Sequence, residues 1–430
     1  MSAPEFTVEI FQNEYLPAGT REVNAIATVT SAGAVGSARS AAGSGAEIII
    51  VDCSGSMGAP KLKIMRARDA AAAAIDAIRD GVAFSVIAGT DVPWPHYPKG
   101  MKLAIADDST RESAKQSLAH MRPQGGTAIG QWLDLARQIF LTREDALRHA
   151  ILLTDGRNGE PAVDLAAAIE RCQGVFNCDC RGVGTDWKVD ELRRISGALL
   201  GTVDIVPDPA GLTVDFEAMM TASMGKAVAD VAIRVWTPQH ARVRYVKQVA
   251  PTVEDLTARR TEINPQQGDY PTGSWGTESR DYHLCVDVDP AAVGGPEMLA
   301  ARVSLVTTMD SVPHSLGQGL VRAIWTDDEA LSTRINREVA HYTGQADLAQ
   351  AIQDGLKARD EGDEQTASAR LGRAVALAHE SGNTDTAGLL AKVVDVLDPA
   401  TGTVRLKRAV ADADEMALDT RSSKTVRVKK

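Results

Sequence analysis

The sequence predicts a chain of three parts: an α/β domain with a doubly wound parallel sheet, an antiparallel β-sandwich and a C-terminal helical bundle. Between residues 46 and 225, short apolar runs alternate with segments of helical period, as in parallel sheets that helices cover on both faces. The helical period stops after residue 225 and returns after residue 326. With 430 residues, the chain is long enough for two to four domains of ~100–200 residues, each with its own core.

The domain boundaries follow from changes in local composition and in the pattern of apolar residues. Residues 1–30 alternate apolar and polar side chains around a Leu-Pro-Ala-Gly turn, which predicts two strands that we expect to join the β-sandwich. Residues 31–45 are rich in Ser, Gly and Ala and resemble a flexible linker. The α/β domain then extends over residues 46–225.

In the second half of the chain, the pattern of apolar residues changes twice. Residues 226–325 show apolar or alternating runs between turns rich in Pro and Gly, which predicts the β-sandwich. Within the sandwich, we expect the Tyr-Pro-Thr-Gly-Ser-Trp-Gly segment at 270–276 to form a loop. Residues 326–398 hold three or four helical segments with short breaks, typical of antiparallel helices in a small bundle. Residues 399–430 remain as a basic tail.

Charge and composition exclude several classes of protein. The formal net charge is -11, which argues against general nucleic-acid binding, because that needs a positive surface. The N-terminus lacks the pattern of a signal peptide, and no apolar run is long enough to cross a membrane. Five cysteines spread over a long chain do not suggest a disulfide framework. We therefore expect a cytoplasmic protein with reduced thiols.

A group of oxygen-bearing residues follows the first apolar run of the α/β domain. Asp52 would end a strand, and Ser54 and Ser56 follow at alternate positions with Gly55 between them. In open α/β sheets, ligands bind at the carboxyl ends of the strands. A carboxylate and two hydroxyls are hard ligands that suit Mg²⁺ or Mn²⁺ better than zinc or copper. This motif alone is also what many turns before a helix contain.

Two later segments strengthen the metal interpretation. Thr127 follows two glycines in a loop between helices, and Asp155 follows another apolar run. In order and spacing, residues 46–224 resemble a von Willebrand factor type A domain with its metal-ion-dependent adhesion site. The resemblance implies a metal set, and an open position on the Mg²⁺ or Mn²⁺ for an Asp or Glu of a protein partner. The implied set is Asp52, Ser54, Ser56, Thr127 and Asp155.

The whole chain resembles intracellular bacterial proteins that couple such a domain to a β-sandwich and helices, and its layout is similar to that of COPII coat subunits. We expect a metal-dependent protein-interaction scaffold rather than an enzyme, with no catalytic residues, because no H-E-x-x-H, phosphate-binding loop or G-x-S-x-G motif is present. Two alternatives stay open: an accessory subunit that couples an ATPase to its target, and a hydrolase whose metal activates water.

The tail carries a further signal. Residues 403–430 hold eight Lys and Arg against four Asp and Glu, so the tail carries +4 and the rest of the chain -15. The pattern Thr-Val-Arg-aliphatic-basic-basic occurs at Thr403 and again at Thr425. We expect phosphorylation at Thr403, Thr420 or Thr425 by a Ser/Thr kinase, followed by docking of a forkhead-associated domain that also reads Val428, three residues after Thr425. A plain strand and a disordered end are the alternatives.

Three cysteines, Cys172, Cys178 and Cys180, lie within nine residues. They could begin a zinc site, but structural zinc takes four ligands and no fourth Cys or His is near in the sequence. We expect them to be core cysteines, and Cys53 to pack under the loop that carries the candidate metal ligands.

Overall fold

The structure is a computed structural model that describes residues 5–32, 45–59, 61–143, 146–309, 312–334 and 336–427. The chain divides into two compact units: one is Ala34–Val228, and the other combines Ser2–Gly33 with Ala229–Lys430. Most of the expected linker at 31–45 lies outside the described residues. No helix among those residues is both long and apolar enough to cross a membrane.

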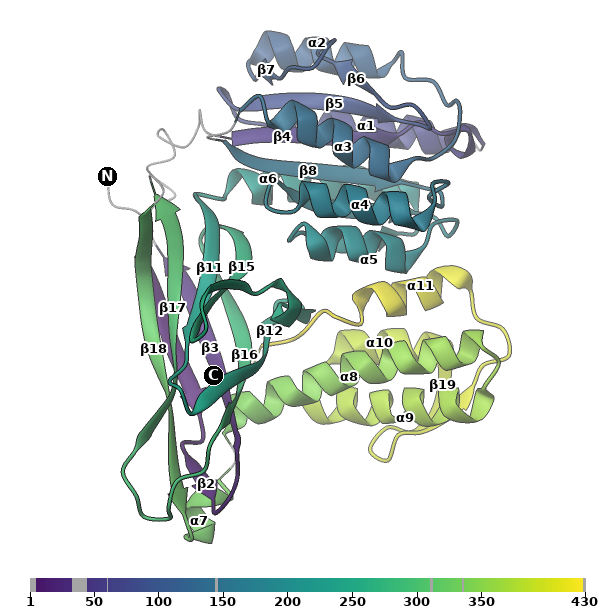
Figure 1. Cartoon of the computed structure of the whole chain (residues 1–430). Helices are drawn as coiled ribbons and strands as arrows, with labels where there is room; N and C mark the ends of the chain where they lie inside the picture. The colour runs from purple at the N-terminus through teal and green to yellow at the C-terminus, as the bar shows by residue number, and fades with distance from the viewer. Residues whose placement is uncertain are drawn as a thin grey trace. The chain divides into compact units, whose positions relative to one another are not determined.

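The first unit is built on a seven-stranded sheet with the order β10-β9-β8-β4-β5-β6, in which β7 also pairs with β5 (Figure 1). The strands are β4 (Gly45–Asp52), β5 (Ala83–Gly89), β6 (Trp94–Tyr97), β7 (Ala104–Ile105), β8 (Leu147–Thr154), β9 (Asn177–Val183) and β10 (Val203–Val206). The helices are η2 (Gly55–Gly58), α1 (Leu62–Ala77), α2 (Asp108–Leu118), α3 (Ile129–Phe140), α4 (Ala162–Cys172), α5 (Val189–Ala198), η3 (Pro209–Gly211) and α6 (Leu212–Met224).

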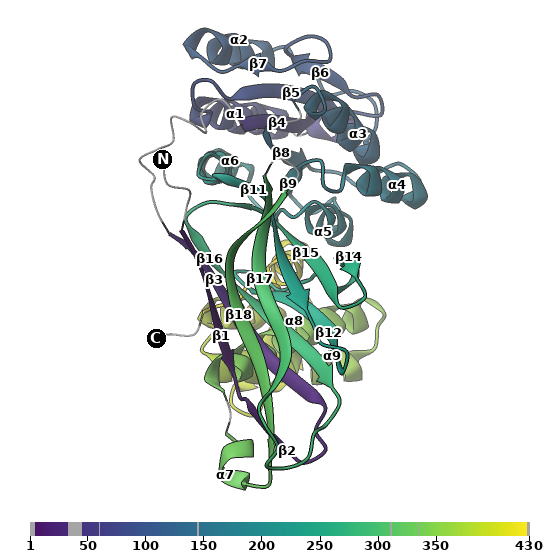
Figure 2. The same ribbon diagram turned by 60° about the vertical axis from the view of Figure 1, so that its left-hand side comes forward.

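The sheet of this unit is covered on both faces, which explains its continuous apolar strands. All residues of β5, and all of β4 after Gly45, are buried. One face packs against α1, α2 and α6, which share a core cluster with alternate residues of β4, β5 and β8. Helices α3, α4 and α5 lie on the other face (Figure 2). The prediction of a doubly wound α/β domain is confirmed. The strands β10, β9, β8, β4 and β5 pair in parallel, and β6 and β7 pair antiparallel to β5.

The second unit contains a β-sandwich. One sheet has the order β1-β3-β16-β12-β13 and the other β14-β15-β11-β17-β18-β2. The N-terminal strands β1 and β3 pair with each other, and β3 pairs with β16. The elements are β1 (Glu5–Gln12), β2 (Tyr15–Pro17), β3 (Glu22–Ala32), β11 (Val228–Trp236), β12 (Ala241–Ala250), β13 (Glu254–Asp255), η4 (Thr257–Arg259), β14 (Thr261–Asn264), β15 (Gln267–Trp275), β16 (Glu278–Val288), β17 (Met298–Met309) and β18 (Val312–Thr326).

One segment of the sandwich differs from the prediction. Residues 270–275, expected to form a loop, belong to strand β15. Tyr270 and Trp275 are buried, and the Thr272 hydroxyl donates a 2.6 Å hydrogen bond to the carbonyl of Val231. The aromatic side chains therefore fix the segment in the sheet despite its proline and glycine.

The second unit also contains the helical region: α7 (Glu329–Ser332), α8 (Arg337–Asp360), α9 (Glu364–Ser381), α10 (Thr384–Val393), the hairpin of β19 (Val394–Asp398) and β20 (Thr403–Leu406), and α11 (Asp412–Arg421). A boundary at residue 398 was expected, but the structure contradicts it. Leu418 belongs to the same apolar cluster as residues of α8, α9 and α10, and Val404 and Leu406 pack against that cluster. Most of the predicted tail is thus part of the folded region, because its apolar residues have a core to join.

Candidate functional site

The candidate site lies where strands β4 and β8 end side by side. Val51 and Leu153 are register partners in these parallel strands, so the residues that follow them reach the same edge of the sheet. Asp52 ends β4, and Thr154 and Asp155 end β8 and begin the next loop. Both carboxylates are fully buried, so each needs partners for its oxygens.

Asp52 is held by hydrogen bonds. One oxygen, Oδ1, accepts from the backbone N–H of Ser54 at 2.8 Å. The other, Oδ2, accepts from the hydroxyl of Thr154 at 2.6 Å and from the backbone N–H of Asp155 at 3.4 Å. Burial raises the pKa of Asp52 to about 6, although the hydrogen bonds from Ser54 and Thr154 oppose this rise. A nearby cation would favour the ionised form of this carboxyl.

The two serines link this carboxylate to Asp155. The hydroxyl oxygens of Ser54 and Ser56 lie 3.0 Å apart, and the Ser56 hydroxyl donates to Oδ1 of Asp155 at 2.7 Å. The other carboxylate oxygen, Oδ2, accepts from the ammonium of Lys63 at 2.7 Å. Four of the five predicted residues are therefore linked by a continuous chain of hydrogen bonds at the edge of the sheet.

Thr127 reaches the same place from the loop before α3. A Cβ atom added at Gly156 would lie 3.4 Å from the Thr127 hydroxyl oxygen and 3.5 Å from that of Ser56, so both hydroxyls face this glycine. The loop is fixed by backbone bonds: the Thr127 carbonyl accepts from Gly159 at 2.7 Å, and the Gly125 carbonyl accepts from Gly55 at 3.0 Å. The structure therefore brings all five predicted residues together.

Several supporting residues were not identified from the sequence. Thr154 and Lys63 contact the two carboxylates directly. Asn158 and Glu160 accept hydrogen bonds from the first backbone N–H groups of α3, at 3.0 and 2.6 Å, and so hold the helix that follows Thr127. Thr154 is adjacent to the predicted ligand Asp155 in the sequence. No sequence spacing predicts Lys63, because its contact with Asp155 depends on the direction in which α1 follows the loop.

The donor set suits a hard cation. Over the part of the chain that the structure describes, no group of three or more His, Cys, Asp or Glu side chains could hold a metal ion. A cation at this edge would therefore depend on serine and threonine hydroxyls together with carboxylates. Oxygen-only sets of this kind favour Mg²⁺ or Mn²⁺.

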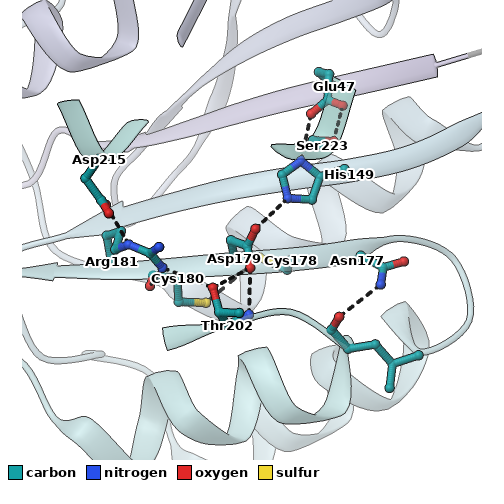
Figure 3. Close-up of polar contacts among 11 residues, drawn as sticks. Glu47, His149, Asn177, Cys178, Asp179, Cys180, Arg181, Thr202, Asp215 and Ser223 are labelled. Carbon is teal, nitrogen blue, oxygen red and sulfur yellow. Dashed lines mark hydrogen bonds and ion pairs between the residues drawn. The ribbon is translucent and has the colours of Figure 1, made fainter. Parts of the chain in front are cut away.

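A second polar cluster lies nearer the amino ends of the same strands (Figure 3). His149 of β8 lies between two carboxylates: Nδ1 is 2.8 Å from Glu47 of β4, and Nε2 is 3.0 Å from Asp179 of β9. Ser223 donates to Glu47 at 2.7 Å, and the Thr202 hydroxyl donates to Asp179 at 2.7 Å. Burial lowers the pKa of His149, but the two carboxylates outweigh this effect and raise it to about 10. The imidazolium therefore ties three strands together.

The cysteines are buried in the apolar core of the first unit, apart from Cys285, which is buried in the second. Cys172, Cys178 and Cys180 are buried free thiols, and the sulfur atoms of Cys178 and Cys180 lie 4.0 Å apart. Cys53 is also buried, beneath the loop of the candidate site, and burial raises the pKa of its thiol to about 12. A thiol with so high a pKa is unreactive at neutral pH.

The three tail threonines have different surroundings. Thr403 is exposed at the start of β20, whereas the side chain of Thr420 in α11 is buried. Thr425 is half-buried, and its hydroxyl donates a 2.6 Å hydrogen bond to the carbonyl of Val249. Val428, the expected second contact of a forkhead-associated domain, lies outside the described residues.

Comparisons with known proteins agree with this fold. Residues 46–205 match the family model of the von Willebrand factor type A domain, and residues 376–422 match that of the von Willebrand factor type A C-terminal domain. A solved von Willebrand factor type A structure from Catenulispora acidiphila is 51% identical with a TM-score of 0.94, covering 99% of this chain and 98% of that chain. No curated protein matches the chain.

Two more distant structures share the fold. The ArnB paralog VWA2 from Sulfolobus acidocaldarius has a TM-score of 0.56 at 14% identity, covering 99% of this chain and 100% of that chain. The human COPII-coat protein Sec24c has a TM-score of 0.55 at 9% identity, covering 89% and 58%. Type A domains commonly mediate protein–protein interaction. From its identity to the Catenulispora protein over almost its whole length, the chain belongs to the von Willebrand factor type A family.

Proposed function

We propose that this protein is a cytoplasmic, divalent-metal-dependent interaction scaffold whose metal binds an acidic side chain of a protein partner. The observation that supports it most is the continuous chain of hydrogen bonds from Asp52 through Ser54 and Ser56 to Asp155, at the carboxyl edge of the sheet. Thr127 completes the set from the neighbouring loop. Because these side chains already lie together, we expect metal binding to need no large rearrangement of the loops.

The residues fit Mg²⁺ or Mn²⁺ for a physical reason. The Ser56 hydroxyl donates its hydrogen to Asp155 and accepts from Ser54, which leaves one oxygen lone pair available to a cation. Mg²⁺ keeps several waters and takes few protein carboxylates, and this site offers two. When bound, the metal would supply a position that an Asp or Glu of a partner can occupy. The fixed loops would hold the remaining ligands.

The metal site is tested by stability. Thr127→Val removes a hydroxyl at the amino end of α3, and Thr142→Val removes an exposed one just beyond its carboxyl end. With Mg²⁺ or Mn²⁺ at about 100 times the dissociation constant, the wild type and Thr142→Val should gain ~2.7 kcal/mol in unfolding free energy over EDTA buffer. Thr127→Val should gain much less. Equal melting temperatures in metal and EDTA for the wild type would refute the proposal.

The interaction is tested with the same variants. Tagged wild type and Thr142→Val should capture a partner in Mg²⁺ and release it in EDTA, whereas Thr127→Val and Asp52→Ala should capture little in either buffer. Replacing the partner's Asp or Glu residues singly by Asn or Gln should identify the carboxylate. Capture that is equal in Mg²⁺ and EDTA would show that the interaction does not use the metal.

We also propose that phosphorylation of tail threonines by a Ser/Thr kinase regulates this scaffold through a forkhead-associated domain protein. Thr403 is the accessible candidate, because it is exposed and two basic residues, Lys407 and Arg408, follow it closely. At Thr425, phosphate would remove the hydrogen bond to Val249, since a phosphoester oxygen cannot donate. Phosphorylation of Thr420 would need local unfolding of α11, because its side chain is buried. Mass spectrometry of the protein from cells with an active kinase should find phosphate at Thr403 or Thr425, and its absence from both would refute this part.

A further inference from the structure

Lys63 occupies an unusual position beside the candidate metal site. It lies in the first turn of α1, a turn that carries no acidic residue, although the helix dipole disfavours positive charge at that end. Its side chain is only 15% exposed, and its ammonium lies 2.7 Å from Oδ2 of the fully buried Asp155. The contact with Asp155 therefore explains why a lysine is held there.

This ammonium takes one of the two Asp155 oxygens. The other, Oδ1, accepts from the Ser56 hydroxyl, which is also a proposed metal ligand. A divalent cation bound between Ser56 and Asp155 would lie close to the ammonium and against the fully buried Asp155 carboxylate, although Ser56 itself is exposed. Two positive charges that share one buried carboxylate repel each other, so the cation and the ammonium oppose each other.

The structure also offers the ammonium a second position. Asp186, in the loop between β9 and α5, has a carboxylate oxygen 3.7 Å from the Lys63 Nζ. The side chain of Asp186 is 75% exposed, so it can pair with the ammonium in a well-solvated place. A shift of Lys63 toward Asp186 would free Oδ2 of Asp155.

We propose that Lys63 is a built-in counter-cation of Asp155, which holds the site together without metal and which a divalent metal must displace toward Asp186. The inference rests on the metal site proposed above and adds its regulation. Metal affinity is then set by competition with a residue of the chain itself. The wild type should be stable without metal and should bind metal weakly.

The test compares Lys63→Met with Lys61→Met, which removes an exposed lysine at the start of the same helix. Isothermal titration with Mn²⁺ should show Lys63→Met binding about tenfold more tightly than the wild type, equivalent to ~1.4 kcal/mol. In EDTA, Lys63→Met should melt at a lower temperature than the wild type, because the Asp155 charge is then buried alone. Lys61→Met should match the wild type in both measurements, and Lys63→Arg should keep weak binding.

Asp186→Asn provides the second arm of the test. It should weaken Mn²⁺ binding when Lys63 is present and have no effect in the Lys63→Met background. If Lys63→Met unfolds in EDTA, recovery of its fold on adding Mn²⁺ supports the proposal, and failure to recover overturns it. Equal Mn²⁺ affinity of Lys63→Met and Lys61→Met also overturns it while leaving the metal site intact. Absence of binding in every variant overturns the metal site, and the role of Lys63 with it.

Discussion

Asp52 and Asp155 are buried side by side, yet their charges are balanced in different ways. Asp155 has an ammonium partner, whereas Asp52 accepts hydrogen bonds from a hydroxyl and two backbone N–H groups. The sequence identified both carboxylates, because each follows a buried strand. It could not identify Lys63, because that contact depends on the path of the chain between the loop and α1.

His149 gives a prediction for pH dependence. Its pKa is raised from an ordinary value near 6.5 to about 10 in the folded protein, so its stabilising effect is complete below pH 6.5 and is lost as the pH rises toward 10. Across that range, we expect the unfolding free energy to fall by up to ~1.4 kcal/mol per pH unit from this residue. His149→Gln should lack this part of the slope. Urea denaturation at several pH values measures it.

His120→Gln is the control for this measurement, because His120 is an exposed histidine of the same unit. It should keep the slope of the wild type. At pH 6.5, His149→Gln should also be less stable by ~3–5 kcal/mol, since Glu47 and Asp179 lose the cation between them. A slope in His149→Gln equal to that of the wild type would contradict the assignment.

At the scale of elements, the strands and helices of the first unit were predictable because their periods are clear. Helix α3 has apolar residues at the spacing of one helical face, and β4 has a continuous apolar run from Ile48 to Val51. Strand β15 was missed, because its Pro271 and Gly273 are usual in turns and the burial of Trp275 depends on distant strands. The hairpin β19–β20 was not predicted as a pair: a strand at Thr403 was only one alternative, and residues 394–398 were included in the helical region.

Close packing of α9 against the β19–β20 turn predicts the effect of a substitution. Gly372 of α9 and Gly402 of the turn lie so close that a Cβ on either would overlap the carbonyl oxygen of the other. Gly372→Ala should therefore destabilise the protein by ~1–3 kcal/mol, although alanine favours helices. Gly388→Ala in α10 meets open space and should stabilise by up to ~1 kcal/mol.

Thermal denaturation of these two variants gives a direct comparison, because both replace a helical glycine of the same region. The expected melting temperatures fall on opposite sides of the wild type. A Gly372→Ala variant that melts at or above the wild-type temperature would show that α9 can move away from the turn without loss of packing.

At the scale of the whole molecule, the end of the described chain returns to the sandwich of the second unit. Val253 donates to the Ser423 carbonyl at 2.7 Å, and Thr425 donates its backbone N–H to Pro251 at 3.0 Å. Arg427 then pairs with the buried Asp281 at 3.1 Å. As far as residue 427, these contacts replace the disordered end that was one interpretation of the sequence.

The contribution of the Arg427–Asp281 ion pair to stability can be tested. The Asp281 carboxylate also accepts hydrogen bonds from Thr28 at 2.7 Å and Tyr342 at 2.5 Å, so it joins β3, β16, α8 and the tail. Arg427→Ala should destabilise the protein by ~1–3 kcal/mol and increase hydrogen exchange at the Val253 amide. Arg405→Ala, which removes an exposed pair with Asp395, should change stability by less than ~1 kcal/mol. Equal exchange at Val253 in both variants would contradict the role of Arg427.

Strands β1 and β3 belong to the second unit, but the whole first unit is encoded between them and β16, the partner of β3. Glu22 of β3 has Asp287 as its register partner, so about 265 residues separate the two in synthesis. At about 5–20 residues per second, β3 would wait roughly 13–53 s on the ribosome before β16 emerges. The first unit can fold during that interval. The N-terminal strands, with unpaired edges, would meanwhile be exposed to other nascent chains and to chaperones.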